Sequence, residues 1–297
     1  MSGTPPVSVR KPRIEKNHAR GRLWAFLVLA VLLLAAALFA RHLCPYDPNA
    51  QIFDTLAPPS AEHLCGTDRY GRDLFSRILM GLQTSVLSTL ALVAMIAVAG
   101  SAVGVLCGYW GGAVDAVMMR VSDVCLAFPG LVFAMAIAAL LGGGLHNAVL
   151  ALAVISWPKY ARLARSQTLA LKSTDYIAAA RLAGDTSLQV ICRHILPNIA
   201  GPIFVTAMLD IGTMMMELAG LSFLGLGAQP PTAELGSMMS SGRSMLQTYP
   251  WVILAPGIAI FVAVVIFNLL GDAARDYLDP RNSRSGASEE KRRGEEG

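Results

Sequence analysis

Charged residues are scarce in this sequence. Asp, Glu, Lys and Arg make up only 15% of the 297 residues, whereas a soluble domain averages roughly a quarter. Hydrophobic residues make up 54%, and the mean hydropathy is +0.53. The scarcity is local, because long charge-free runs alternate with short basic stretches. Since a charge at the centre of a bilayer costs at least about 2.5 kcal/mol, this alternation indicates a membrane protein.

The sequence also lacks the motifs of several common enzyme and nucleic-acid-binding classes. It has no Gly-x-x-x-x-Gly-Lys-Ser/Thr stretch to cradle phosphates and no His-Glu-x-x-His helix. The five histidines are widely separated in the chain: His18, His42, His63, His146 and His194. Its net charge of +4 gathers at the ends of apolar runs, without a zinc-finger or basic-helix pattern. We therefore expect no catalytic residues, no metal site, no cofactor and no nucleic-acid partner.

Cysteines are few and scattered, at five positions. Only Cys44 and Cys65 share one predicted loop, so a single disulfide there is one alternative. We expect free and structurally inert thiols instead.

Six apolar stretches come close to the 20 or so residues that a membrane-spanning helix needs. The first, Leu23–Ala40, exceeds the usual 7–15 residues of a signal-peptide core, and Leu38 fits the cleavage rule poorly, so we expect an uncleaved span. The other five are Ser85–Cys107, Val114–Leu141, Ala148–Leu163, Ile199–Leu224 and Trp251–Leu270. The predicted fold is all-α, a polytopic membrane helix bundle with about six transmembrane helices.

Basic residues set the expected orientation, because they favour the cytoplasmic side. Residues 1–22 and 159–198 each carry six Lys or Arg, whereas 226–250 carries one. Both termini are therefore predicted to be cytoplasmic. The expected organisation is a cytoplasmic tail at 1–22, a first transmembrane helix at 23–40, an extracytoplasmic segment at 41–84, a core domain at 85–271 with a cytoplasmic loop at 174–198, and a cytoplasmic tail at 272–297.

The loop reads DYIAAARLAGDTSLQVICRHILPN over residues 175–198. Asp175 suits the first turn of a short helix, and Gly184 suits the position after its end. Thr186 and Gln189 have capping-box spacing, which predicts a second helix, and Pro197 marks where it yields to the next span. Two interpretations remain open: a loop lying on the membrane surface, or an element that docks a soluble partner.

A family resemblance favours docking. The loop residues Tyr176, Ala178, Ala179, Ala180, Arg181, Gly184, His194 and Pro197 resemble the ATPase-coupling signature of bacterial ABC importer permeases. One departure is that the usual Glu-Ala-Ala is Ala-Ala-Ala here, so an acidic contact is missing. The stretches CPYDPN (44–49), GTDRYGRDLFSR (66–77), GYWGGAVD (108–115), LSFLGLG (221–227) and FNLLGDAARDYLDPR (267–281) resemble the second permease subunit of dipeptide, oligopeptide and nickel importers.

The resemblance implies a type I ABC importer permease fold in the cytoplasmic (inner) membrane, surrounded by lipid. Its expected partners are a second homologous permease subunit, two cytoplasmic ABC ATPase subunits and an extracytoplasmic substrate-binding protein. Contact with that binding protein is one interpretation of Asp68, Arg69, Arg72 and Asp73. The other is an Asp–Arg network that ties the outer loop together.

Two acids interrupt the fifth span, and we expect them to face a partner or a path rather than lipid. Asp210, Met214 and Glu217 share a helix face, which suggests either a cation path or a polar contact between helices with methionine as filler. LDIGTMMMELAGLSFLGLG (209–227), PTAELG (231–236) and the missing loop Glu look closest to the nickel branch. The predicted cargo is therefore nickel, free or chelated, with dipeptides or oligopeptides as the alternative.

Overall fold

The computed structural model describes residues 14–278, in which the regular elements are all helices and no strand is present. The long helices are α1 (Ile14–Leu38), α3 (Leu74–Trp110), α6 (Leu145–Lys172), α9 (Leu196–Phe223) and α11 (Trp251–Leu278). The shorter ones are α2 (Ala40–Leu43), α4 (Gly112–Ala127), α5 (Gly130–Leu140), α7 (Asp175–Leu182), α8 (Ser187–Gln189), the π-helical turn η1 (Val190–Ile195), α10 (Leu235–Gly242) and the 3-10 turn η2 (Arg243–Met245). The all-α prediction is confirmed.

The predicted tails lie only partly within the described residues. α1 begins at Ile14, inside the predicted tail 1–22, and α11 continues to Leu278, beyond the predicted boundary at 271. Residues 1–13 and 279–297, which include the stretch after Pro280 that we expect to be disordered, lie outside the described residues.

Four described helices are long and apolar enough to cross a membrane: Arg20–Leu38, Leu74–Trp110, Ser187–Phe223 and Trp251–Leu278. The predicted span Val114–Leu141 is wrong as one helix, because α4 and α5 meet at an angle of 97°. Pro129 disfavours helical backbone at Phe128, which is extended with φ −101° and ψ 150°. If α4 and α5 are counted together as one broken span, they are a fifth candidate for a membrane crossing.

The remaining predicted crossing, Ala148–Leu163, corresponds to α6, which has 28 residues. At 1.5 Å per residue it is about 42 Å long, enough to cross a bilayer. Its amino-acid composition is less apolar than that of the four helices named above. Lys159, Arg162 and Arg165 all lie in its second half, so only its first half is a continuous apolar run.

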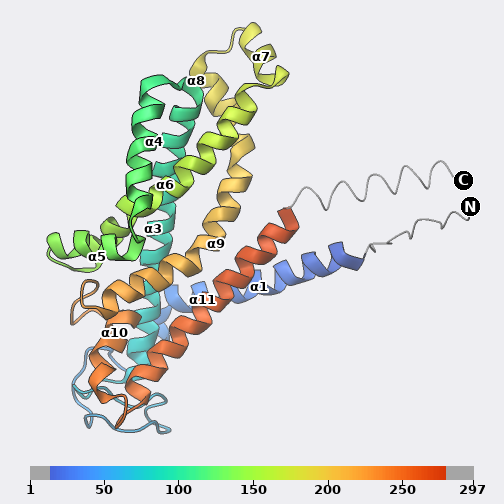
Figure 1. Cartoon of the computed structure of the whole chain (residues 1–297). Helices are drawn as coiled ribbons and strands as arrows, with labels where there is room; N and C mark the ends of the chain where they lie inside the picture. Colours follow the sequence, from blue (N-terminus) through green and yellow to red (C-terminus); the bar gives the residue numbers. More distant parts are fainter. Residues whose placement is uncertain (1–13, 279–297) are drawn as a thin grey trace, which may run out of the picture.

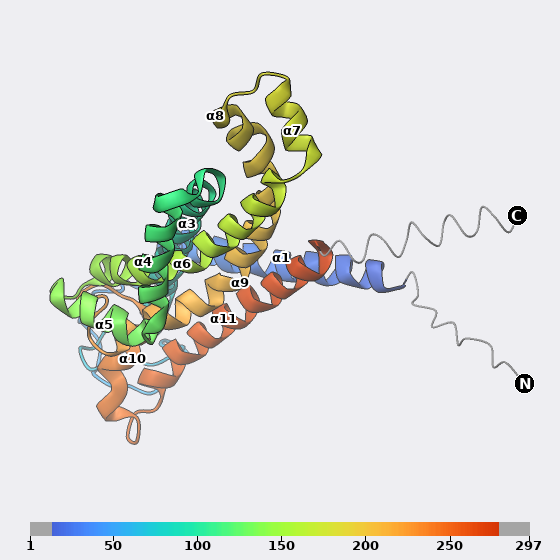
Figure 2. The ribbon, with the colours of Figure 1, turned by 45° about the horizontal axis from the view of Figure 1, so that its top comes forward.

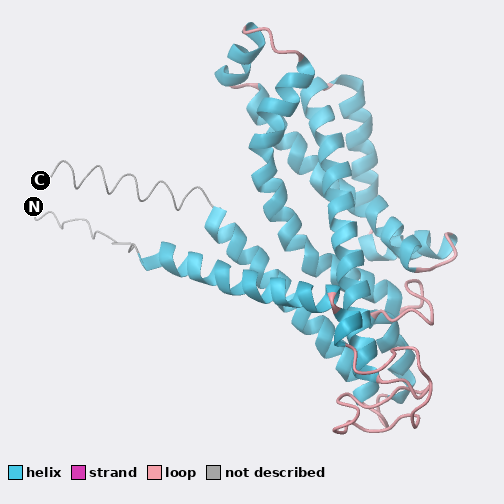
Figure 3. Ribbon diagram, turned by 180° about the vertical axis from the view of Figure 1, so that it is seen from behind, coloured by secondary structure: helices cyan, strands magenta, loops and turns pink. Residues whose placement is uncertain are grey.

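The bundle has two distinct ends. α7 and α8 lie at one end, and the segment 41–73 lies with α10 at the other (Figure 1). The extended loops gather at the α10 end (Figure 3). In both Figure 1 and Figure 2, α1 and α11 run side by side and extend away from the other helices. The charge pattern predicts that the α7 end is cytoplasmic.

A row of glycines brings α3 against α6 at backbone distance. Gly100, Gly104 and Gly108 are spaced by four, so they lie on one face of α3. A Cβ on Gly100 would lie 2.5 Å from the carbonyl oxygen of Trp157, and one on Gly104 would overlap the carbonyl oxygen of Ala161. Small residues at this spacing are the usual means of close helix packing in membranes. The glycine spacing is visible in the sequence, but only the fold shows that α6 packs against it.

Gly104→Ala is expected to destabilise the bundle, because the added methyl group must push α3 away from α6. Overpacking of this kind costs typically about 1–3 kcal/mol. The measurement is thermal unfolding of the detergent-purified chain, followed by tryptophan fluorescence.

Gly201→Ala is the matched control, since a Cβ there meets no atom within 4 Å. Its helix propensity gain, up to about 1 kcal/mol, predicts an unchanged or higher melting temperature. Equal melting temperatures for Gly104→Ala and the wild type would show that the glycine contact is not needed.

Candidate functional site

The α7 end contains the loop predicted to couple to an ATPase. Gly184 follows α7 with a φ of +97°, the left-handed backbone that favours glycine. Thr186 and Gln189 form the predicted capping box: the Thr186 N–H donates to Gln189 Oε1 at 2.7 Å and the Gln189 N–H to Thr186 Oγ1 at 3.4 Å. Both local predictions are confirmed.

The loop helix yields to the next span beside Pro197, as predicted, because η1 ends at Ile195 and α9 begins at Leu196. The transition has no break: α8 passes through the π-helical turn η1 directly into α9, giving one helical run from Ser187 to Phe223. Pro197 lies in the first turn of α9, where a missing N–H is tolerated. The loop is therefore continuous with the span that follows it.

One apolar side chain anchors α7. Ile177 is completely buried in a small cluster that also contains Val190, Ile195 and Ile199. Burying a side chain of this size is worth about 1.5–3 kcal/mol. α7 is thereby seated on the helical turns that lead into α9.

A polar bridge supplements this anchor. His194 Nδ1 lies 2.5 Å from the Tyr176 hydroxyl, and His194 Nε2 lies 2.8 Å from Asp185 Oδ2. The Tyr176 and His194 rings also meet edge to face, with centroids 5.1 Å apart. Both ring nitrogens are therefore engaged, and the bridge joins α7, the turn after it and η1. Nothing in the sequence spacing had singled out Asp185.

The remaining predicted coupling residues lie on the outside of α7. Ala178 and Ala179 are exposed and Ala180 is half-buried. Arg181 is also exposed, but its guanidinium lies 5.2 Å above the Tyr109 ring of α3. The alanines therefore leave one side of α7 open to a partner, while Arg181 ties the helix to the bundle.

The middle of the bundle contains the three residues predicted to line a path. Asp210, only 3% exposed, forms an ion pair through Oδ1 with the ammonium group of Lys159 on α6. Its other oxygen and the Tyr160 hydroxyl are buried without a hydrogen-bond partner among residues 14–278. Met214 is buried too. The sequence spacing could not reveal Lys159, which is 51 positions away.

Glu217 differs from Asp210. It is half-buried and has no hydrogen bond or ion pair within the part of the chain that the structure describes. Gly220, three residues on, faces open space. Within that same part of the chain, no three His, Cys, Asp or Glu side chains come together in a way that could hold a metal ion.

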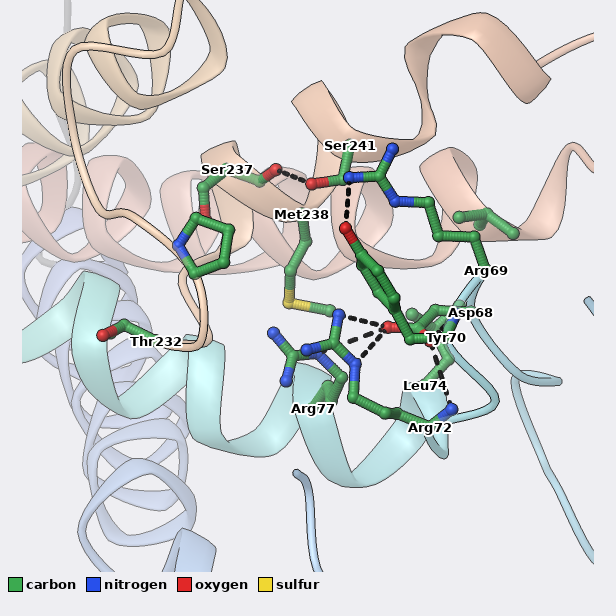
Figure 4. Close-up of a pocket in the computed structure, with 12 residues that line it drawn as sticks. Asp68, Arg69, Tyr70, Arg72, Leu74, Arg77, Thr232, Ser237, Met238 and Ser241 are labelled. Atoms are coloured by element: carbon green, nitrogen blue, oxygen red, sulfur yellow. Dashed lines mark hydrogen bonds and ion pairs between the residues drawn. The ribbon is translucent and has the colours of Figure 1, made fainter. Parts of the chain in front are cut away.

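At the opposite end, the predicted binding-protein residues form an internal network (Figure 4). Asp68 accepts hydrogen bonds from the backbone of Tyr70 at 2.8 Å and pairs with Arg72 at 2.6 Å. Asp73 accepts from His63 Nδ1 at 2.9 Å. Asp68, Arg72 and Asp73 are buried. Arg69 is exposed and lies 4.7 Å above the Tyr70 ring, so it is the member of the set that a partner could reach.

Two further charged residues hold this end together and were overlooked. Arg77 donates to the carbonyl oxygen of Pro48 at 3.1 Å and to Asn49 Oδ1 at 3.2 Å. Glu234, fully buried, caps α10 and accepts from Ser85 Oγ of α3 at 3.0 Å. Glutamate is not among the usual helix-capping residues, so the sequence did not indicate that Glu234 begins a helix.

Cys44 and Cys65 are free, as expected. Burial, and next the negative charge of Asp73, raise the pKa of both thiols. A raised pKa lowers the thiolate fraction, which makes these cysteines unreactive.

Comparison with known proteins identifies the family. Residues 100–284 match the family described as binding-protein-dependent transport system inner membrane component. The chain is 46% identical over 255 residues to the probable D,D-dipeptide transport system permease protein DdpC of Escherichia coli (strain K12), covering 86% of each. It is 44% identical over 293 residues to the glutathione transport system permease protein GsiD of Pectobacterium atrosepticum, covering 95% of this chain and 96% of that one.

A solved structure supports the fold. A chain of the inward-facing MetNI methionine ABC transporter aligns with a TM-score of 0.53 and 20% identity, over 67% of this chain and 95% of that one. The helical bundle and the sequence matches lead to one conclusion. The chain belongs to the family of binding-protein-dependent transport system inner membrane components, as a multi-pass permease subunit of the ABC importer type and not an enzyme.

Proposed function

We propose that this chain forms half of the translocation pathway of an ATP-driven importer for short peptides. The observation that carries the proposal is the 44–46% identity, over most of the chain, to permeases named for D,D-dipeptide and glutathione transport. The nickel cargo first expected from the sequence receives no support from these relatives. We therefore prefer the peptide alternative.

The geometry of the middle of the bundle agrees with this preference. Asp210 had suggested a cation path, but Lys159 balances its charge. Glu217 is the acid that remains unpaired among the described residues of α9, and a peptide presents one ammonium group to it. We propose a pathway role for Asp210, Met214 and Glu217 in which Asp210 supports the structure and Glu217 meets the cargo.

The partners we propose follow from the two ends of the bundle. Two ATPase subunits would dock on α7 and its counterpart in a second permease subunit, with both termini cytoplasmic. Ala178 stands where the family signature has an acid, so the ATPase contact would depend on the exposed apolar surface of α7. Leu182 on that surface is 90% exposed. On the outer side, Arg69 would contact the binding protein, while Asp68, Arg72 and Asp73 hold the loop that presents it.

Cells that lack their own peptide and nickel importers and express the complete system are expected to take up labelled D-alanyl-D-alanine or glutathione but not radioactive nickel. Unlabelled peptide should compete, and nickel salts should not. Nickel uptake that peptides fail to reduce would instead support the original interpretation.

Lys159→Gln is expected to harm the transporter more than Asp210→Asn. The first leaves a buried carboxylate without its counter-charge, at a cost of about 1–3 kcal/mol or more. The second leaves only a half-exposed ammonium group, which water can solvate. The measurement is the melting temperature and yield of the purified chain.

The double variant Lys159→Gln/Asp210→Asn should resemble Asp210→Asn, because it removes both charges. Glu217→Gln, which breaks no contact among the described residues, is the control and should fold normally. Equal losses from the two single variants would contradict this assignment of the buried partner.

Tyr176→Phe and Asp185→Ala are each expected to lower the amount of peptide transported per ATP hydrolysed. Each removes one hydrogen bond from His194, worth about 0.5–1.5 kcal/mol, and loosens α7. ATP hydrolysis itself should continue, so the readout is transport and hydrolysis measured together in proteoliposomes. Ser187→Ala, at an exposed position of the same loop, should leave the ratio unchanged. An unaltered ratio in both test variants would mean that the bridge does not couple.

A further inference from the structure

A polar groove opens at the end of the bundle opposite α7. Its volume is about 480 Å³, which lies within the usual range for small-ligand sites, about 300–1,000 Å³. Arg69, the end of α9, the turn after it and the last residues of α10 form its walls. A smaller pocket beside it shares Arg69, Ser237 and Ser241 but measures about 30 Å³ (Figure 4). That smaller pocket has room for water and not for a peptide.

The charge of the groove has one sign. Arg69 and Arg243 line it, and no Asp or Glu does. Arg243 is exposed, and its guanidinium group forms no hydrogen bond or ion pair with any residue between 14 and 278. Asp68, the acid next to Arg69 in the chain, is already paired with Arg72. The groove therefore attracts anions.

Hydroxyl groups in the wall are also left without partners. Ser240 and Ser244 line the groove, and neither hydroxyl group makes a hydrogen bond within the described part of the chain. Ser222, only 1% exposed, lines it as well, and its Oγ is buried without a partner. Buried polar groups are nearly always hydrogen-bonded, so a buried hydroxyl group without a partner needs an explanation. In contrast, Ser237 and Ser241 already donate to backbone carbonyls of this segment, at 2.9 and 3.0 Å.

The wall is held in shape by its own contacts. Gln229 Nε2 donates to the carbonyl oxygens of Gly225 at 2.9 Å and Gly227 at 3.3 Å, which fixes the turn between α9 and α10. Glu234 caps α10 from within the bundle. The arginines and serines are thus presented by a rigid rim, which reduces the ordering that a ligand must impose.

We propose that this groove binds the terminal carboxylate of the peptide cargo at the outer mouth of the pathway. A carboxylate accepts about four hydrogen bonds, and an arginine can supply two of them in parallel. Arg243 and Arg69 would provide the charge, and Ser240 and Ser244 the further donors. The inference rests on the proposed function, because it takes the cargo to be a peptide.

The position of the groove suits this role. It reaches the end of α9, and Glu217 lies on the same helix five residues before Ser222, about 7.5 Å along the axis. A peptide held by its carboxylate in the groove would therefore find an unpaired acid for its ammonium group further in.

The test is equilibrium dialysis of radiolabelled alanyl-alanine against the complete purified importer, without the binding protein. N-acetyl-alanyl-alanine, which keeps the carboxylate, is expected to compete. Alanyl-alanine amide, which lacks it, should compete at least tenfold more weakly. Arg243→Gln should weaken binding of alanyl-alanine about tenfold. Arg41→Gln is the matched control, because this exposed arginine lies at the same end outside the groove.

Three results would overturn the inference: equal competition by the amide, unchanged peptide binding in Arg243→Gln, or, in a separate titration with the binding protein, an effect of Arg243→Gln that is confined to binding-protein affinity. The third would mean that the groove holds an acidic side chain of the binding protein. Failure here is distinguishable from failure of the proposed function. An importer that transports peptides but shows no carboxylate preference refutes only the groove, whereas nickel uptake without peptide uptake refutes the cargo.

Discussion

The contact of α3 with α6 through bare glycine backbone is the constraint on which the rest of the structure depends. Lipid offers no hydrophobic force to press helices together, so close van der Waals packing must hold them. Gly100, Gly104 and Gly108 allow that packing over two helical turns. α3, with α6 packed against it, then connects the two ends of the bundle. α3 carries Ser85, which binds the cap of α10, and Tyr109, against which Arg181 of the coupling loop lies.

Ion pairs attach a further helix to the unit of α3 and α6. Arg165 of α6 forms a bidentate pair with Asp115 of α4, at 2.5 and 2.7 Å, and Arg162 pairs with Asp123 at 2.5 Å. These pairs hold the broken span of α4 and α5 to the central unit. Because so many charges in this apolar chain have partners, the ones without partners stand out. They are the natural places to look for contact with cargo or with other subunits.

Features that depend on residues close together in the chain could be predicted from the sequence. Apolar stretches, the capping box and the glycine after α7 follow from residues within a few positions of one another. The break at Phe128 and Pro129 obeyed a rule of the same kind and was overlooked. The Lys159–Asp210 pair was beyond such rules, because it joins two helices that only the tertiary fold brings together. The nickel hypothesis rested mostly on resemblance, and the relatives named for dipeptide and glutathione transport do not support it.

The continuity of the predicted coupling loop with α9 suggests how one end of the molecule can influence the other. Had Pro197 ended a helix, a push on α7 would be absorbed by a flexible joint. Instead η1 leads into α9 without interruption, with Ile177 and the His194 bridge seating α7 on that junction. The same helix carries Asp210, which is tied to α6, and then Glu217, which is not tied to any described residue. A displacement of α7 would thus reach a helix whose middle is fixed by an ion pair and whose end away from α7 borders the groove.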